Sequence, residues 1–208
     1  MRFPSRSRIA RILRTNRGGT MRGNRTFGRL LAALLPAVAL LAPAAGHAAT
    51  ALRMDLSALI GASDLVVRGT VDRASCRLTE YGRIVTDSVV RVDEPLVGEP
   101  GGDSLVVSTL GGVVGDQGQY VSGSPVLKPG DEVVLFLKRT GAPSALSRAS
   151  VVGLAQGAFH VERWSGRPTL VRHLDGMILT GIDAVPIPED LDALRESIRT
   201  LVPAGVQR

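Results

Sequence analysis

Two histidines, His160 and His173, have the clearest potential for metal or acid–base chemistry in this chain. They lie within and just after two short segments, 158–164 and 168–172, whose composition and spacing predict a β-hairpin with a two-residue turn. Such a hairpin would place both histidines and Glu162 on one face, with the histidines about 7–8 Å apart. Imidazole and carboxylate groups are common zinc ligands. An outward-facing histidine needs no metal, however, and we predict neither a metal nor another cofactor.

Ser104 is a second candidate, because residues 102–105 read Gly-Asp-Ser-Leu. This segment resembles the nucleophile block of the GDSL hydrolases. A nucleophilic serine needs a histidine base and an acid that orients the base, and here His160 or His173 would have to be that base. In the GDSL family the serine follows a strand and opens onto a helix, whereas Ser104 follows a glycine turn and begins a strand. We therefore expect an ordinary strand residue, with a secreted hydrolase as the alternative.

The segment 111–130 is the predicted binding region. It contains six glycines and two prolines, and connections longer than about 12–15 residues are usually functional or mobile. Loops on rigid scaffolds often carry binding residues. Its glycine spacing matches neither a dinucleotide-binding nor a phosphate-binding motif, while a calcium site in the loops stays open. The predicted contact residues are Gly111, Gly112, Gly115, Asp116 and Tyr120.

The elements that must position these residues are mostly strands. Alternation of apolar residues and short apolar runs predict strands at residues 65–73, 83–93, 104–109 and 132–138. The last of these is the most apolar and is expected to be central. Gly69 predicts a bulge or bend within its strand, and Pro95 predicts that regular pairing ends there or that the strand becomes an edge. Residues 140–150 are expected to form a surface loop, and residues 151–154 to begin the last part of the sheet.

A helix is expected near each end of the folded part. Residues 54–63 begin with Asp55 as a possible cap, and residues 189–201 have leucine and isoleucine at helical spacing. Strands and helices do not alternate along the chain, which argues against a parallel α/β sheet. A mainly β domain remains, either a small antiparallel barrel or a sandwich, over residues 49–185. Residues 186–208 then form a C-terminal helix and tail.

Residues 1–48 have the composition of an export signal. They contain nine arginines and no acidic residue, and an apolar run at 30–42 is followed by small residues. These are the parts of a signal peptide. We predict cleavage between Ala48 and Ala49, with translation beginning at Met1 or Met21. The apolar run is shorter than the roughly 20 residues of a spanning helix. No stable membrane anchor is therefore expected after cleavage, and the protein is expected in the periplasm or outside the cell.

The charge of the chain depends on that segment. The full sequence has 25 basic and 19 acidic residues, and without the nine arginines the balance is 16 to 19. The high sequence pI of about 10.6 is therefore due to the arginines of the export segment. No basic cluster with interleaved aromatic residues remains, so no nucleic-acid partner is predicted. A single cysteine, Cys76, cannot form an internal disulfide, and it is expected to be buried and inert.

Several segments resemble a family of uncharacterised exported bacterial proteins, namely residues 64–71, 87–98, 104–112, 129–137 and 151–161. More distantly, the strand order resembles the netrin-like module of tissue inhibitors of metalloproteinases. This resemblance implies an OB-like five-stranded barrel, to which the residue pattern adds a short N-terminal and a C-terminal helix. Those inhibitors use an N-terminal cysteine and several disulfides, which this chain lacks, so no inhibitory residue is carried over.

Together these features favour an exported, non-catalytic binding or interaction domain. Its partner would be an unknown protein or an envelope ligand. The alternatives are the secreted hydrolase that uses Ser104 and a structural protein of the envelope.

The export prediction is tested by mass spectrometry of the protein recovered after secretion. We expect the mature chain to begin at Ala49, because the cut follows the small residue Ala48. A recovered chain that still carries residues 1–48 would contradict the prediction.

Overall fold

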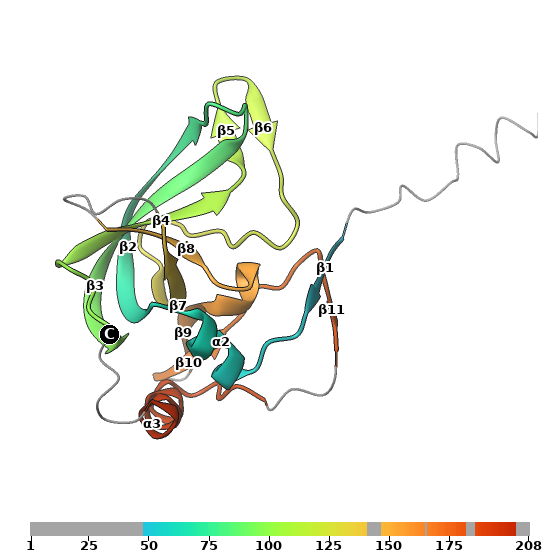
Figure 1. Ribbon diagram of the computed structural model, residues 1–208. Helices are drawn as coiled ribbons and strands as arrows, with labels where there is room; N and C mark the ends of the chain where they lie inside the picture. Colours follow the sequence, from blue (N-terminus) through green and yellow to red (C-terminus); the bar gives the residue numbers. More distant parts are fainter. Residues whose placement is uncertain (1–47, 141–146, 165, 182–185, 203–208) are drawn as a thin grey trace, which may run out of the picture. The chain divides into compact units, whose positions relative to one another are not determined.

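The computed structural model describes residues 48–140, 147–164, 166–181 and 186–202. The predicted export signal lies outside the described residues, except for its last residue, Ala48. The described part is mainly β, and five strands close into a barrel (Figure 1). The barrel strands are β2 (Leu65–Leu78), β3 (Ile84–Val97), β4 (Ser104–Leu110), β7 (Glu132–Arg139) and β8 (Ser147–Val151).

The pairing order of the barrel is β2-β3-β4-β8-β7, and β7 returns to β2. The β4–β8 pair is parallel, and the other four pairs of the ring are antiparallel. The predicted small OB-like barrel with a C-terminal helix is therefore confirmed. Its helices are α2 (Leu56–Ala62) and α3 (Leu191–Leu201).

The sheet continues beyond the barrel through β9 (Ala158–Trp164) and β10 (Arg167–Val171). Trp164 pairs with Arg167, so the predicted hairpin with a two-residue turn is confirmed, although Ser165 lies outside the described residues. Four short strands were not predicted. They are β1 (Ala49–Leu52), which pairs in parallel with β11 (Met177–Thr180), and the hairpin of β5 (Gly112–Val114) and β6 (Gln117–Gln119).

Two apolar cores lie on the two faces of the sheet. Strand β7 alternates between them: Val133, Leu135 and Leu137 belong to the barrel interior, while Val134 and Phe136 belong to the second core. The second core also contains apolar residues of β2, β9, β10 and both helices. Because both faces of β7 are covered, its side chains form a continuous apolar run, as the sequence predicted for a central strand.

Both helices begin at an aspartate cap. The Asp55 carboxylate accepts a hydrogen bond from the backbone N–H of Ala58 at 2.8 Å, and the Asp190 carboxylate accepts one from that of Ala193 at 2.9 Å. An aspartate at this position satisfies backbone donors that the first helical turn leaves free. Helix α3 therefore starts two residues later than predicted, because Asp190 lies before the helix and not inside it.

Gly69 lies at a bulge between β2 and β3, as its position within the strand predicted. The pairing register shifts between Arg68 and Gly69. A Cβ atom at residue 69 would lie 2.3 Å from the backbone oxygen of Arg91. Glycine is therefore required by the close approach of the neighbouring strand. Strand β2 continues to Leu78, five residues beyond the predicted end.

Pro95 does not end its strand, since β3 continues to Val97. The last pair between β3 and β4 is Arg91 with Ser104. After Arg91, β3 has no further pairs with β4, so that side of the strand is an edge. Pro95, which has no backbone N–H, is tolerated at an edge. The expectation of an edge was right, and the expectation of a strand end was wrong.

Three other expectations are corrected by the structure. The predicted surface loop 140–150 contains the first residues of β8, and its residues 141–146 lie outside the described residues. Residues 151–154 do not begin a strand; β8 ends at Val151, and a 3-10 turn, η1 (Leu154–Gly157), follows. Cys76 is exposed and not buried, because it lies in the part of β2 that extends beyond the apolar core.

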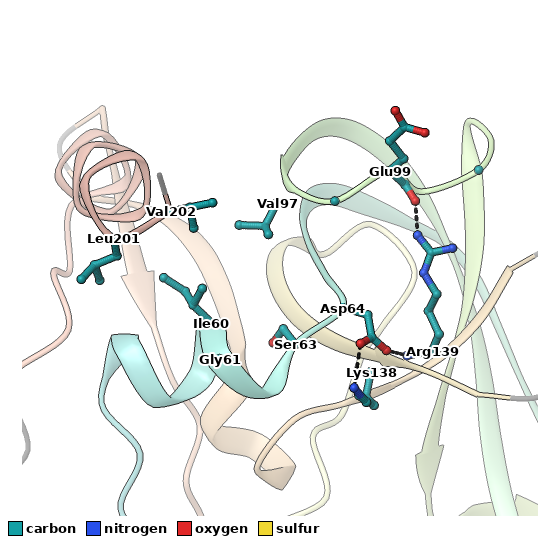
Figure 2. A pocket seen from close by; sticks show the side chains of 12 residues that line it. Ile60, Gly61, Ser63, Asp64, Val97, Glu99, Lys138, Arg139, Leu201 and Val202 are labelled. Carbon is teal, nitrogen blue, oxygen red and sulfur yellow. Dashed lines mark hydrogen bonds and ion pairs between the residues drawn. The ribbon is translucent and has the colours of Figure 1, made fainter. Parts of the chain in front are cut away.

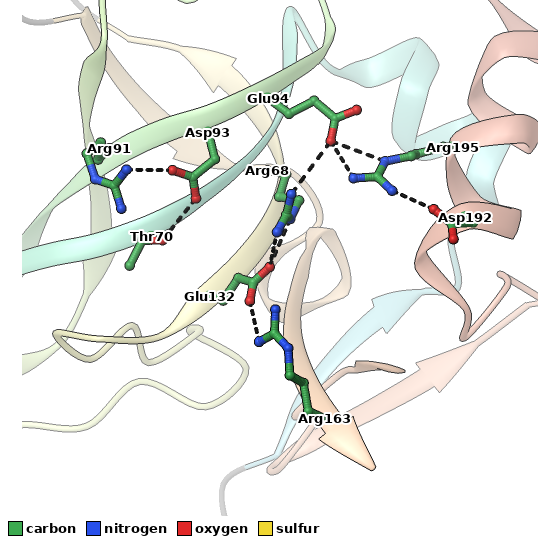
Figure 3. Close-up of polar contacts among 9 residues, drawn as sticks. All are labelled: Arg68, Thr70, Arg91, Asp93, Glu94, Glu132, Arg163, Asp192 and Arg195. Atoms are coloured by element: carbon green, nitrogen blue, oxygen red, sulfur yellow. Dashed lines mark hydrogen bonds and ion pairs between the residues drawn. The ribbon is translucent and has the colours of Figure 1, made fainter. Parts of the chain in front are cut away.

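A row of charged side chains with alternating sign crosses the sheet and reaches α3 (Figure 3). Glu132 accepts hydrogen bonds from Arg68 at 2.9 Å and from Arg163 at 2.7 Å. Glu94 accepts one from Arg195 of α3 at 2.6 Å, and its carboxylate lies 3.9 Å from Arg68. Isolated surface pairs contribute little to stability, but such a network fixes the position of the helix better than any single pair.

Replacement of Gly69 by alanine tests the bulge. The added Cβ atom would overlap the Arg91 carbonyl, so we expect the free energy of unfolding to fall by about 1–3 kcal/mol. Gly61→Ala in α2 is the matched control, since a Cβ there meets nothing within 4 Å, and alanine favours a helix by about 1 kcal/mol over glycine. Urea unfolding of both variants measures the difference. Equal effects would contradict this reading of the bulge.

Candidate functional site

The described residues form a groove of about 730 Å³ where β7 begins. We call it the histidine groove. Its lining comes from the connection before β7, from β9, from the segment after β10, and from single residues of β2 and β7. The lining residues are Thr70, Tyr120, Ser124, Val126, Lys128, Gly130, Asp131, Glu132, His160, Val161, Glu162, Arg163, His173 and Asp175.

The histidine groove joins two features that the sequence analysis treated separately. The histidines His160 and His173 come from the β9–β10 hairpin and its continuation, and Tyr120 comes from the predicted binding region 111–130. The hairpin turns back along β7 through the pairing of Val133 with His160. The connection ends at Asp131, immediately before β7, so the two segments meet at the start of that strand.

The two histidine side chains are in direct contact, closer than the separation of about 7–8 Å expected from the hairpin. Their ring centroids lie 4.8 Å apart in an edge-on arrangement. A carboxylate lies near each ring: Asp131 Oδ2 is 3.6 Å from Nδ1 of His160, and Glu162 Oε1 is 3.9 Å from Nε2 of His173. The side chain of His160 is 14% exposed and that of His173 is 54% exposed. The pair therefore has one sheltered and one accessible imidazole.

Burial controls the charge of the sheltered histidine. Desolvation lowers the pKa of His160, and the nearby Asp131 carboxylate opposes this only in part. The neutral imidazole is thus favoured in the folded protein. For Glu132, burial acts to raise the pKa, but hydrogen bonds from Arg68 and Arg163 outweigh it and lower the pKa below its usual value. Glu132 is therefore a charged member of an ion-pair network and is not available as a general acid.

Imidazole and carboxylate groups at the histidine hairpin are the types of side chain that bind zinc. In the described part of the chain, no group of three or more His, Cys, Asp or Glu residues is arranged to hold a metal ion. The two carboxylates lie 3.6 and 3.9 Å from the imidazole nitrogens, which is beyond hydrogen-bond distance. The neutral imidazole of His160 can accept a hydrogen bond.

Of the five predicted contact residues, Tyr120 lines the groove and is 78% exposed. Gly112 instead packs against β2 and β3, where an added Cβ would lie 2.5 Å from the sulfur of Cys76. Gly111 lies immediately before the β5–β6 hairpin and has a positive φ of 94°. Gly115 and Asp116 lie exposed at the β5–β6 turn. A binding role for all five residues stays a prediction. The predicted long connection 111–130 is corrected to a hairpin followed by a shorter connection.

Ser104 lies apart from the histidines. It begins β4, which pairs with β3 and β8, whereas His160 lies on β9, which pairs with β7 and β10. Ser104 lines neither the histidine groove nor the second cavity described below. The fold therefore does not bring the candidate nucleophile to its candidate bases, because their strands are separated in the sheet.

A second cavity, of about 780 Å³, lies beside the two helices (Figure 2). Its apolar wall includes Ile60 and Val202, and its polar wall includes Lys138 and Asp64. Lys138 donates a hydrogen bond to Asp64 at 2.6 Å, and this bond lowers the pKa of the carboxyl group. Arg139 donates to the backbone oxygen of Glu99 (Figure 2). The cations of this cavity already have partners within the protein.

Asp87 is the centre of a polar cluster that sequence reasoning missed. Its carboxylate accepts hydrogen bonds from Arg77 at 2.8 Å, from Arg148 at 3.0 Å and from Ser108 at 2.6 Å. Burial acts to raise its pKa, but these three donors lower it to about 2. The donors come from β2, β8 and β4, so the cluster links these three strands to β3, which carries Asp87. The sequence predicted the strand that carries Asp87 but could not identify partners 10, 21 and 61 residues away.

Comparisons with known proteins found no match among family models, curated proteins or solved structures. The resemblance to exported bacterial proteins and to the netrin-like module stays a prediction. None of the helices in the described part of the chain combines the length and apolar character needed to cross a bilayer.

The sheltered histidine predicts a pH-dependent stability. Because the folded protein lowers the pKa of His160, the unfolded chain binds a proton more readily. The stabilising contribution is present above the ordinary histidine pKa of about 6.5 and is lost as pH falls through the lower folded value. We expect the free energy of unfolding to fall between pH 7 and pH 5, and to fall less in His160→Gln.

His173→Gln is the control for that experiment, since it changes the exposed ring of the same pair. It should retain most of the decline, because burial of His160 is the larger cause of the shift. Denaturant unfolding at several pH values provides the comparison. An unchanged slope in His160→Gln would refute the assignment.

Acid stability also tests the Asp87 cluster. The pKa of this carboxyl is lowered to about 2, so its stabilising contribution is present above the unfolded value of about 4 and lost as pH falls toward 2. Asp87→Asn should lower the free energy of unfolding at pH 7 more than at pH 2. A pH-independent difference, measured by chemical unfolding at both values, would contradict the ionised form as the origin of the effect.

Proposed function

We propose that this chain is an exported, non-catalytic binding domain whose ligand contacts the histidine groove. The observation that carries the proposal is the convergence of Tyr120, His160 and His173 on one cavity. These residues come from distant parts of the sequence, and the barrel together with the β9–β10 hairpin holds them at the start of β7. Export rests on the composition of residues 1–48.

The chemistry of the lining favours binding. Tyr120 offers an exposed aromatic ring and a hydroxyl group, a combination common at binding hot spots. The neutral imidazole of His160 can donate one hydrogen bond and accept another. Val126 adds an exposed apolar side chain, with 64% of its surface accessible. Aromatic, apolar and hydrogen-bonding groups around one concave surface are the usual elements of a ligand site.

The alternative of a hydrolase has less support. Ser104 lies on β4, away from both histidines. Ser124 does line the groove, but its hydroxyl oxygen accepts a hydrogen bond from the backbone N–H of Leu110 at 3.0 Å. A nucleophilic serine needs a base within hydrogen-bonding reach. The described geometry therefore favours a binding domain over serine-based catalysis.

An NMR screen of the mature protein against short peptides and envelope saccharides tests the proposal. We expect binding compounds to shift the imidazole resonances of His160 and His173, and Tyr120→Ala to weaken binding at least tenfold. Tyr81→Ala is a matched control, because Tyr81 is 83% exposed and lies outside the groove lining. It should bind as the wild type does.

Two results would count against the proposal. Compounds that bind without moving either histidine, and that are insensitive to Tyr120→Ala, would place the site elsewhere. Labelling of Ser104 by a serine-reactive probe, with ester hydrolysis lost in Ser104→Ala, would favour the hydrolase instead.

A further inference from the structure

We propose that the histidine groove takes an extended peptide segment of a partner protein, which adds to the open edge of β9 as a further strand. This inference rests on the proposed function, because it names the class of ligand for the same groove. It is carried by the strand pairing around β9, by the turn that leads the chain away from β9, and by the side chains that line the groove beside it.

Strand β9 has two neighbouring strands along only part of its length. It pairs with β10 over residues 160–164, whereas its pairing with β7 ends at His160. In the described part of the chain, β9 beyond His160 therefore has a neighbouring strand on one side only. Val161 and Arg163 line the histidine groove, so this edge of the sheet opens into a concave surface.

The main-chain groups of β9 alternate between its two sides. Leu170 of β10 donates its N–H to the carbonyl oxygen of Glu189 at 2.6 Å, so Leu170 points away from β9. Its partner across the ladder is Val161. In an antiparallel ladder the two residues of such a pair exchange no hydrogen bonds, and both point outward. Val161 and, two residues further along, Arg163 therefore direct their N–H and C=O groups toward the open edge.

A turn in the connection before β7 opens this edge. The N–H of Asp131 donates to the carbonyl oxygen of Lys128 at 3.0 Å, and Gly130 has a positive φ of 93°, as a turn with proline and glycine at its centre requires. The N–H of Gly130 then donates to the carbonyl oxygen of Val71 at 2.8 Å, and the carbonyl oxygen of Asp131 accepts from the N–H of Val71 at 2.9 Å. The chain ahead of β7 is thus bound to β2 and leaves β9.

Two other edges of the same sheet are protected. The outer edge of β10 is covered by the bond from Leu170 to Glu189, and Pro168 on that strand has no N–H to offer. The edge of β3 beyond its last pair with β4 carries Pro95. Proteins protect edges in these ways because unpaired main-chain groups are a template for another strand. Residues 161–164 contain no proline and face a groove, so this edge is available to a partner strand.

The groove supplies side-chain contacts for such a strand. Residues 161–164 span about 13 Å at the usual rise of a strand, which suits a partner segment of about four to six residues. Successive side chains of that segment point to opposite faces, and those on the groove face would meet Tyr120 and Val126, which are both largely exposed. In this mode of recognition, main-chain hydrogen bonds provide affinity and pockets for alternate side chains provide specificity.

The experiment uses a capped hexapeptide of alternating threonine and valine, together with two N-methylated forms of it. One form is methylated on its second and fourth residues and the other on its third and fifth, so each form blocks one edge of the peptide strand. NMR titration of the mature protein should show binding of the parent peptide. One methylated form should bind within about twofold of the parent and the other at least tenfold more weakly, because a strand pairs with β9 through one edge only.

The protein provides an independent readout. The parent peptide should shift the amide resonance of Arg163, which faces the open edge, and leave that of Thr169, which faces β9 from β10, nearly unchanged. Arg163→Pro removes the open N–H and should weaken binding at least tenfold, whereas Arg163→Ala keeps it and should bind within about twofold of the wild type. Both variants lose the ion pair with Glu132, so their difference isolates the N–H. Circular dichroism verifies folding, and the methylated peptides decide if Arg163→Pro does not fold.

The outcomes distinguish failure of this inference from failure of the proposed function. Equal retention or equal loss of binding by the two methylated peptides would overturn the inference. If the parent peptide does not bind while other compounds still move the histidine resonances, the inference is wrong and the proposed function stands. If no compound engages the groove, both are refuted.

Discussion

The structure depends on one strand that is covered on both faces. Strand β7 pairs with β2, β8 and β9, and its side chains enter the barrel interior and the second core in turn. Each of its five central side chains is fully buried. A polar residue at any of these positions would lack water and a partner, which costs free energy. The unbroken apolar run from Val133 to Leu137 is therefore the requirement from which both cores follow.

The second core explains why the helices lie where they do. Their apolar faces cover the outer side of the sheet, and polar contacts then orient them. Arg195 joins α3 to β3 through Glu94, and the buried amide of Gln156 binds the backbone of Leu52 and Met54 ahead of α2, at 2.9 Å in each case. Buried polar groups must be paired to be tolerated. These contacts select one arrangement of the helices and strands. The hydrophobic effect alone, which has no directional preference, would not select it.

The histidine groove follows from the same architecture. The connection that carries Tyr120 leads directly into β7. Strand β9 pairs with β7 and extends the sheet beyond the barrel. These two features bring Asp131, His160 and the end of the hairpin together at one point. Solvent reaches Tyr120 and His173 there, while His160 is partly sheltered. Binding groups are thus placed by a rigid sheet, although two of them lie on connecting segments.

Local pattern alone determined the central strand, the β9–β10 hairpin, the two helices, the Asp55 cap and the adjacency of His160 and His173, because each depends on residues close in sequence. It could not show that β4 pairs with β8, that 111–130 contains a hairpin, or that Cys76 is exposed. Nor could it join Tyr120 to the histidines or give Asp87 its partners. Those features depend on which distant strands become neighbours, and that is decided when β7 closes the barrel and buries both of its faces.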